Sequence, residues 1–145
     1  MSAPELDGSY RTPRLEHARV ADAMRQGIFT CPAGASLSQA ARTMSLHHVH
    51  TVVVIDPADG SPVGILSDSA LVSALLDVAG EEPILGEVAD RDLSMISSSE
   101  PLRVAAEMMR DRGIAHLLVR DAGSGIPTGM LSTLDVAGIL AWGEA

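Results

Sequence analysis

Lysine is absent from this chain of 145 residues, and all ten of its basic side chains are arginines. This absence excludes functions that need a lysine ammonium, such as P-loop phosphate binding, Schiff-base catalysis and kinase-type phosphate transfer. Nineteen acidic residues outnumber the arginines and give a formal net charge of −9. Because so acidic a chain repels DNA, RNA and anionic lipid, we expect neither nucleic acid nor a membrane as a partner.

Cysteine and aromatic residues are also scarce. Cys31 is the only cysteine, which excludes an intrachain disulfide and a Cys-x-x-Cys metal site. We expect it to be a small buried apolar residue rather than a reactive thiol. Aromatic residues make up 2% of the chain and apolar residues 46%, so the core must consist of Val, Leu, Ile, Met and Ala.

Long apolar runs are missing as well. No run reaches the roughly 18–20 residues of a membrane span, and the N-terminus lacks the basic-then-apolar pattern of a signal peptide. We therefore expect a soluble, cytoplasmic protein.

The chain does contain an internal repeat with a constant offset between its two copies. Residues 127–135 repeat residues 62–70, so that Gly129 corresponds to Gly64 and Ser132 to Ser67. The same offset relates the apolar positions Leu37, Ala40, Ala41 and Met44 to Leu102, Ala105, Ala106 and Met109. The repeat predicts two units of the same structure, and since one such short unit alone would be marginally stable, we expect them to share one core.

Each unit is predicted to have the order β-α-β-β-α, an α/β (α+β) fold. In the first unit, Ser36 and Gln39 form a capping box before an apolar helical stripe, and a hairpin at 51–66 precedes a helix at 68–78. Its inward positions are predicted to be Leu71, Leu75 and Val78. In the second unit, Pro101 is predicted as the first helical residue, after a cap at Ser99 or Glu100. The predicted boundaries are a loose N-terminal arm at 1–17 and units at 18–80 and 81–145.

These features resemble the cystathionine-β-synthase (CBS) domain pair, or Bateman module. The resemblance rests on the doubled β-α-β-β-α unit and on the Gly-apolar-apolar-Ser-x-x-Asp element at 129–135, and it covers about residues 18–142. It implies two tandem units with pseudo-two-fold symmetry, further association into a homodimer, and clefts between the units for AMP, ADP, ATP or S-adenosylmethionine. We expect a free-standing, regulatory pair of this kind, whose response is read by an effector protein.

The resemblance also implies ligand contacts. Asp135 falls where the family's aspartate takes the ribose hydroxyls, and Ser132 where a hydroxyl contacts phosphate. His116 aligns with a position that is frequently basic and faces phosphate. The family usually reads the adenine edge with backbone groups of the other unit, which here are those of Thr30, Cys31 and Val52.

Each of these residues has a structural alternative. Asp135 also suits the first turn of a helix, where a negative charge favours the helix dipole. Ser132 suits the N-cap, and a histidine such as His116 at the start of a strand is often only hydrogen-bonded or exposed.

Two departures from the family pattern limit the expected ligand. In the first unit the aspartate position is Ala70, and Asp68 lies two residues early, so at most one good nucleoside site is expected. Cations are few, with His116 and Arg112 as the candidate phosphate partners. AMP, or an adenosyl group without phosphate, therefore fits better than a triphosphate.

Two other functions remain open. One is an interaction and dimerisation module whose clefts bind nothing, which the loss of the first aspartate favours. The other is a metal-binding protein that uses His47, His48 and His50, although no carboxylate or second cysteine lies at a diagnostic spacing. No nucleophile elbow, paired-carboxylate cleft or metal triad is present, so we expect no enzyme and no obligatory cofactor.

Overall fold

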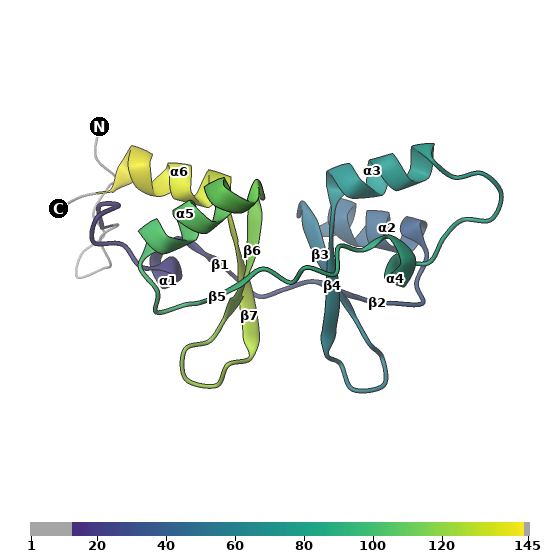
Figure 1. Ribbon diagram of the computed structural model, residues 1–145, viewed down its shortest axis with the longest axis horizontal. Coiled ribbons are helices and arrows are strands. Elements are labelled where there is room, and N and C mark those ends of the chain that lie inside the picture. The colour runs from purple at the N-terminus through teal and green to yellow at the C-terminus, as the bar shows by residue number, and fades with distance from the viewer. Residues whose placement is uncertain (1–12, 144–145) are drawn as a thin grey trace. The chain divides into compact units, whose positions relative to one another are not determined.

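The computed structural model describes residues 13–143 and divides the chain into two compact units (Figure 1). The middle unit is residues 28–93, and the terminal unit combines residues 13–27 with residues 94–143. These bounds differ from the repeat boundary predicted at residues 80 and 81. Each half of the sequence therefore gives one short segment to the unit formed mainly by the other half.

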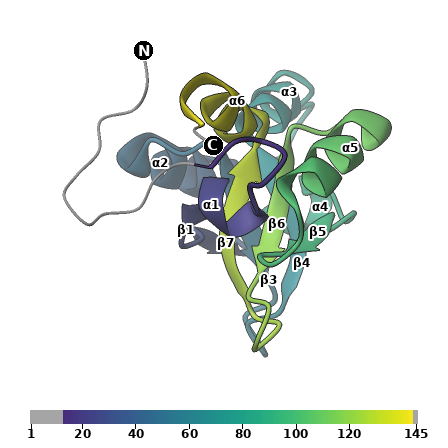
Figure 2. The ribbon, with the colours of Figure 1, turned by 90° about the vertical axis from the view of Figure 1, so that its left-hand side faces the viewer.

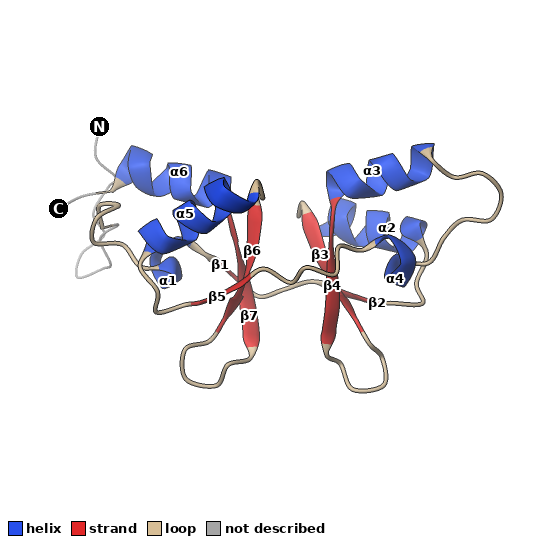
Figure 3. Cartoon of the chain, viewed as in Figure 1, coloured by secondary structure: helices blue, strands red, loops and turns tan. Residues whose placement is uncertain are grey.

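The middle unit has a three-stranded sheet in the order β2-β3-β4. Its strands are β2 (Thr30–Pro32), β3 (Thr51–Ile55) and β4 (Pro62–Ser67). The β2 and β3 strands are parallel, whereas β3 and β4 form the predicted antiparallel hairpin. Its helices are α2 (Leu37–His47), α3 (Asp68–Leu76) and α4 (Leu85–Val88), shown in blue in Figure 3.

The terminal unit has a four-stranded sheet in the order β1-β7-β6-β5. Its strands are β1 (Arg25–Gln26), β5 (Met95–Ser97), β6 (His116–Arg120) and β7 (Pro127–Ser132). Its helices are α1 (Val20–Ala23), α5 (Leu102–Arg112) and α6 (Thr133–Trp142). The parallel β5-β6 pair and the β6-β7 hairpin repeat the arrangement of β2, β3 and β4, which confirms the predicted mixed α/β fold of two like units.

Each unit contains a short segment from the other half of the sequence, here called the exchanged segment: residues 13–27 in the terminal unit and residues 81–93 in the middle unit. Part of each exchanged segment pairs with the second strand of the hairpin in its unit. In the terminal unit, β1 pairs with β7 (Figure 2). Arg25 lies opposite Met130 in this pairing. In the middle unit, Asp90 forms a bridge with Ile65 of β4, and their backbone N–H groups donate to each other's carbonyls at 2.9 Å. Both pairings are close because the strand carries a glycine at the crossing, Gly129 or Gly64, where a Cβ atom would collide with the exchanged segment.

Each unit has a hydrophobic core of its own. The exchanged segments contribute to both cores, because Val20 of α1 and Leu85 of α4 are completely buried. Aliphatic residues fill these cores, and no aromatic residue is among the buried members at 13–143, as the composition predicted. Cys31 is 4% exposed in the middle core, which confirms that it is a buried small residue.

Three local predictions need correction. Pro101 is the N-cap of α5 rather than its first residue, because it is extended and bridged to Arg19, with backbone hydrogen bonds from Val20 to Glu100 and from Leu102 to Ala18. Leu75 is 47% exposed instead of inward, since α3 buries Leu71 and ends at Leu76. The predicted loose arm lies outside the described residues up to residue 12, but at 13–17 the chain makes a turn that packs Leu15 against the terminal core.

None of the helices at 13–143 is long and apolar enough to cross a membrane.

Candidate functional site

Strand β7 ends where helix α6 begins, and this junction carries Ser132 and Asp135. Ser132 is the N-cap, with its Oγ accepting the Asp135 N–H at 3.2 Å. In return, Asp135 Oδ2 accepts the Ser132 N–H at 2.8 Å, which completes a capping box. Both residues thus have the structural role considered as an alternative to ligand binding, which is capping the helix. The second carboxylate oxygen, Asp135 Oδ1, lies outside the capping box.

A cation from the exchanged segment lies beside that second oxygen. Arg25 Nε is 3.8 Å from Asp135 Oδ1, while the Asp135 side chain is 12% exposed and that of Arg25 is 63% exposed. Arg25 is positioned by the pairing of β1 with β7, where it lies opposite Met130. The site therefore combines a carboxylate held at a helix start with a guanidinium that solvent and ligands can reach.

His116 lies at the same end of the terminal sheet. It opens β6 and pairs in register with Ser132, the last residue of β7. Its side chain is half-buried. The structure thus brings Asp135, Ser132 and His116 together within one unit, and it adds Arg25, which sequence reasoning missed.

Arg112, which was considered as a phosphate partner, makes its hydrogen bond elsewhere in the terminal unit. Its Nη1 donates a hydrogen bond to Ser94 Oγ at 3.2 Å, which connects the end of α5 to the segment before β5. Arg25, rather than Arg112, is therefore the arginine found beside Asp135.

The other three predicted ligand residues, Thr30, Cys31 and Val52, belong to the middle unit. Thr30 is exposed on the edge strand β2, whereas Cys31 and Val52 are buried in the middle core. Their assignment as ligand contacts through backbone groups stays a prediction.

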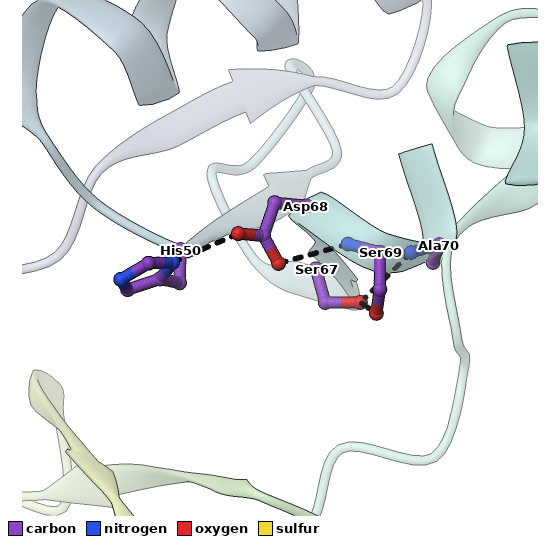
Figure 4. Close-up of polar contacts among 5 residues, drawn as sticks. All are labelled: His50, Ser67, Asp68, Ser69 and Ala70. Carbon is purple, nitrogen blue, oxygen red and sulfur yellow. Dashed lines mark hydrogen bonds and ion pairs between the residues drawn. The ribbon is translucent and has the colours of Figure 1, made fainter. Parts of the chain in front are cut away.

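The corresponding junction of the middle unit is arranged differently (Figure 4). Ser67 caps α3 by accepting the Ala70 N–H at 3.1 Å, as Ser132 does for Asp135. Ala70 has no carboxylate to return the bond. Asp68 instead accepts the Ser69 N–H at 2.8 Å and contacts His50 Nδ1 at 2.8 Å.

The histidines between α2 and β3 have separate surroundings. His47 stacks on Phe29 with ring centroids 4.2 Å apart, and His50 pairs with Asp68. His48 ends α2 in the left-handed conformation, with a φ of 53°. Among the residues that the structure describes, no three His, Cys, Asp or Glu side chains are grouped to hold a metal ion.

A signal for Arg25 was present in the sequence. The offset that relates Gly64 to Gly129 also relates Arg25 to Asp90, which is a reversal of charge at equivalent positions.

Comparison with known proteins gives related sequences and folds. A curated relative, Protein sds23 of Aspergillus niger, is 30% identical over 123 residues, which are 77% of this chain and 24% of that protein. The chain thus spans about a quarter of this relative's length.

Two solved structures share the fold. The CBS domain pair of protein MJ0100, in complex with 5′-methylthioadenosine and S-adenosyl-L-methionine, has a TM-score of 0.75 and 20% identity, covering 86% of this chain and 96% of that one. The CBS domain protein PAE2072 from Pyrobaculum aerophilum, complexed with AMP, has a TM-score of 0.73 and 21% identity, covering 86% and 98%.

A protein-family model also matches this chain. The model of the CBS domain matches this chain twice, at residues 20–77 and 85–141, and the two matches correspond to the two copies of the sequence repeat. The chain therefore belongs to the CBS domain family and carries two CBS domains in tandem.

Proposed function

We propose that this CBS pair is a regulatory protein that binds an adenosyl ligand through the junction of β7 and α6. The observation that carries the proposal is the placement of Asp135, a largely buried carboxylate with one oxygen in the capping box and the other outside it. A carboxylate so placed can accept charge-assisted hydrogen bonds from a ribose diol. Complexes of CBS pairs of the same fold with AMP and with S-adenosyl-L-methionine support the ligand class.

The remaining contacts follow from this anchor. Ser132 and His116, paired at the end of the same sheet, are proposed to face the phosphate or the group that replaces it. That backbone groups of Thr30, Cys31 and Val52 read the adenine edge stays a prediction from the family resemblance.

One ligand per chain is proposed. The junction of the middle unit has Ala70 in place of the anchoring carboxylate, and its neighbouring acid, Asp68, is engaged with His50. AMP is the proposed ligand, since few cations are available to neutralise a triphosphate.

The ligand would act by population shift. A ligand favours whichever arrangement of the protein it binds more tightly, and the size of the response is set by that difference in affinity. We propose that a homodimer passes this response to an effector protein.

The test is calorimetric titration of the protein with AMP, ATP and S-adenosylmethionine, with Asp135→Ala and Asp135→Asn alongside. We expect one AMP per chain and an affinity about 10- to 100-fold lower in both variants, because hydrogen bonds to a charged group contribute about 1.5–3 kcal/mol. Asp135→Asn keeps an oxygen that can accept the Ser132 N–H, and it thereby separates loss of ligand contact from loss of the cap.

Asp22→Ala is the matched control. Asp22 accepts the Arg19 N–H at 2.7 Å in the capping box of α1, within the same unit. Its removal should leave AMP affinity unchanged. Equal affinity in wild type and both Asp135 variants would reject the assigned site, and no binding by any ligand would favour the interaction module.

A further inference from the structure

The two units carry opposite charges at one equivalent backbone position. Arg25 lies on β1 opposite Met130 of β7, and Asp90 lies opposite Ile65 of β4. The repeat offset relates Arg25 to Asp90 and Ile65 to Met130. The position is thus the same in sequence and in strand pairing, and only the sign of its charge differs.

A second difference accompanies the first. In the terminal unit the third residue of the last helix is Asp135, and its carboxylate lies 3.8 Å from Arg25. In the middle unit the corresponding residue is Ala70. The cation is thus found with the carboxylate, and the unit that lacks the carboxylate has an acid in place of the cation.

Simple electrostatics explains why the two positions differ together. A carboxylate that is only 12% exposed is costly without a nearby cation, and Arg25 supplies one. An aspartate at residue 70 would have no such cation at the equivalent position, which is Asp90, and would follow Asp68 by two residues.

We infer that Arg25 is a further ligand-binding residue that makes the terminal unit selective for an anionic nucleotide, while Asp90 makes the middle unit reject one. The inference rests on the proposed adenosyl site. The Arg25 side chain is 63% exposed, so its guanidinium can turn from Asp135 to a phosphate. Arginine suits this role because its planar fork of donors matches phosphate oxygens.

The middle unit has acidic side chains at the corresponding positions. The Asp90 carboxylate accepts the Asp92 N–H at 2.9 Å, and Asp68 at the helix start is about half exposed. The nearby Arg91 donates its Nη2 to the carbonyl of Gly86 at 3.2 Å. At the position where the terminal unit offers a guanidinium, the middle unit therefore has the carboxylate of Asp90.

The first experiment compares AMP with adenosine, which lacks the phosphate, by calorimetry. In Arg25→Gln we expect AMP affinity to fall about 10- to 100-fold, because a charge-assisted contact is lost, and adenosine affinity to change much less. Arg25→Lys should keep most of the preference for AMP. Arg103→Gln is the matched control, since it removes the same charge from an exposed pair with Glu107 in the same unit.

The outcomes separate this inference from the proposed function. If wild type binds AMP and Arg25→Gln loses both ligands by the same factor, Arg25 only positions Asp135 and the inference is overturned. Unchanged AMP affinity in Arg25→Gln overturns it as well, although the adenosyl site would stand. Wild type that binds neither ligand would overturn the proposed function and this inference together.

The second experiment builds the missing site. Ala70→Asp combined with Asp90→Arg should raise the number of AMP molecules bound per chain from one to two, whereas Ala70→Asp alone should leave it at one. A second site in the single variant would show that Asp90 excludes nothing. A double variant with wild-type circular dichroism that still binds one AMP would show that the charge at residue 90 does not decide binding.

Discussion

Asp135 has two roles at the level of a single residue. It completes the capping box of α6, and it is the proposed anchor of the ribose. Loss of a cap costs about 0.5–2 kcal/mol of stability, so a binding defect in an Asp135 variant must be separated from partial unfolding. The asparagine variant makes that separation possible because it retains an acceptor for the Ser132 N–H.

Two other aspartates bind the backbone of the hairpin turns and lead to a prediction about pH. Asp121 Oδ2 accepts the N–H groups of Ser124 at 2.9 Å and Gly123 at 3.1 Å, and the Ser124 hydroxyl at 3.1 Å. These bonds, led by that from the Ser124 backbone, lower the pKa of Asp121 below the ordinary value of 3.8. The side-chain hydrogen bond from Ser61 is the largest cause of the lowered pKa of Asp59 in the other hairpin.

Because the pKa of Asp121 is lower in the folded state than in the unfolded chain, its stabilising effect is present above the unfolded value of about 3.9 and is lost as pH falls through the folded pKa. Ser124→Ala removes the hydroxyl bond, so we expect it to raise the pKa of Asp121 and leave that of Asp59 unchanged. Carboxyl titration by NMR measures both. An Asp121 that titrates at its ordinary value in wild type would contradict the turn geometry.

At the level of elements, the pairing of β1 with β7 depends on Gly129. A Cβ at this position would collide with the carbonyl oxygen of Arg25 and crowd the sulfur of Met24. We expect Gly129→Ala to lower the free energy of unfolding by about 1–3 kcal/mol, as overpacking does, and to weaken AMP binding by displacing Arg25. Urea denaturation and calorimetry measure the two effects.

Gly138→Ala is the control for this substitution. Gly138 lies in α6, and a Cβ there meets nothing within 4 Å. Alanine should raise stability by about 0.5–1 kcal/mol through helix propensity and leave AMP affinity unchanged. A Gly129→Ala protein as stable as wild type would show that β1 can shift away from β7 without cost.

Much of the element order could be predicted, since the information is local. The capping box of Ser36 and Gln39, the hairpins and the order β-α-β-β-α were all correctly predicted from spacing and residue type. Pro101 was wrongly placed inside the helix, because its extended conformation is set by hydrogen bonds to residues 18–20, which are distant in the sequence. Helix propensity depends on residues that are near in the sequence, so it cannot predict a contact with distant ones.

At the level of the whole molecule, the exchange of short segments leads to a prediction about fragments. A chain cut between residues 80 and 81 separates Val20 of α1 from the terminal core and Leu85 of α4 from the middle core. Each of these side chains is fully buried and contributes about 1.5–3 kcal/mol. We expect neither fragment to unfold cooperatively alone, and a mixture of both to recover a cooperative transition.

Circular dichroism during urea denaturation measures this outcome. A cut between residues 93 and 94 is the comparison, because it leaves the middle unit intact and should give a fragment of residues 1–93 that retains cooperative unfolding. Two cooperative fragments from the cut at 80 and 81 would show instead that the repeat boundaries are also folding boundaries.

The exchange itself could not be predicted from the repeat. The offset between the two copies is the same whether a short segment pairs within its own half or with the other half. The junction residues Ser132, Asp135 and His116 lie together because they adjoin one hairpin, which is local information. Arg25 reaches the site only through the exchange.

This exchange also constrains how the gene can change. A recombination event that replaced one sequence repeat would alter parts of both compact units, since the partner of β7 is encoded in the first repeat and the partner of β4 in the second. Because a Cβ at Gly129 would meet the backbone carbonyl of residue 25, a side chain at residue 129 in the second repeat would disturb a segment encoded in the first. Although the sequence repeats, neither copy contains all the segments of one compact unit.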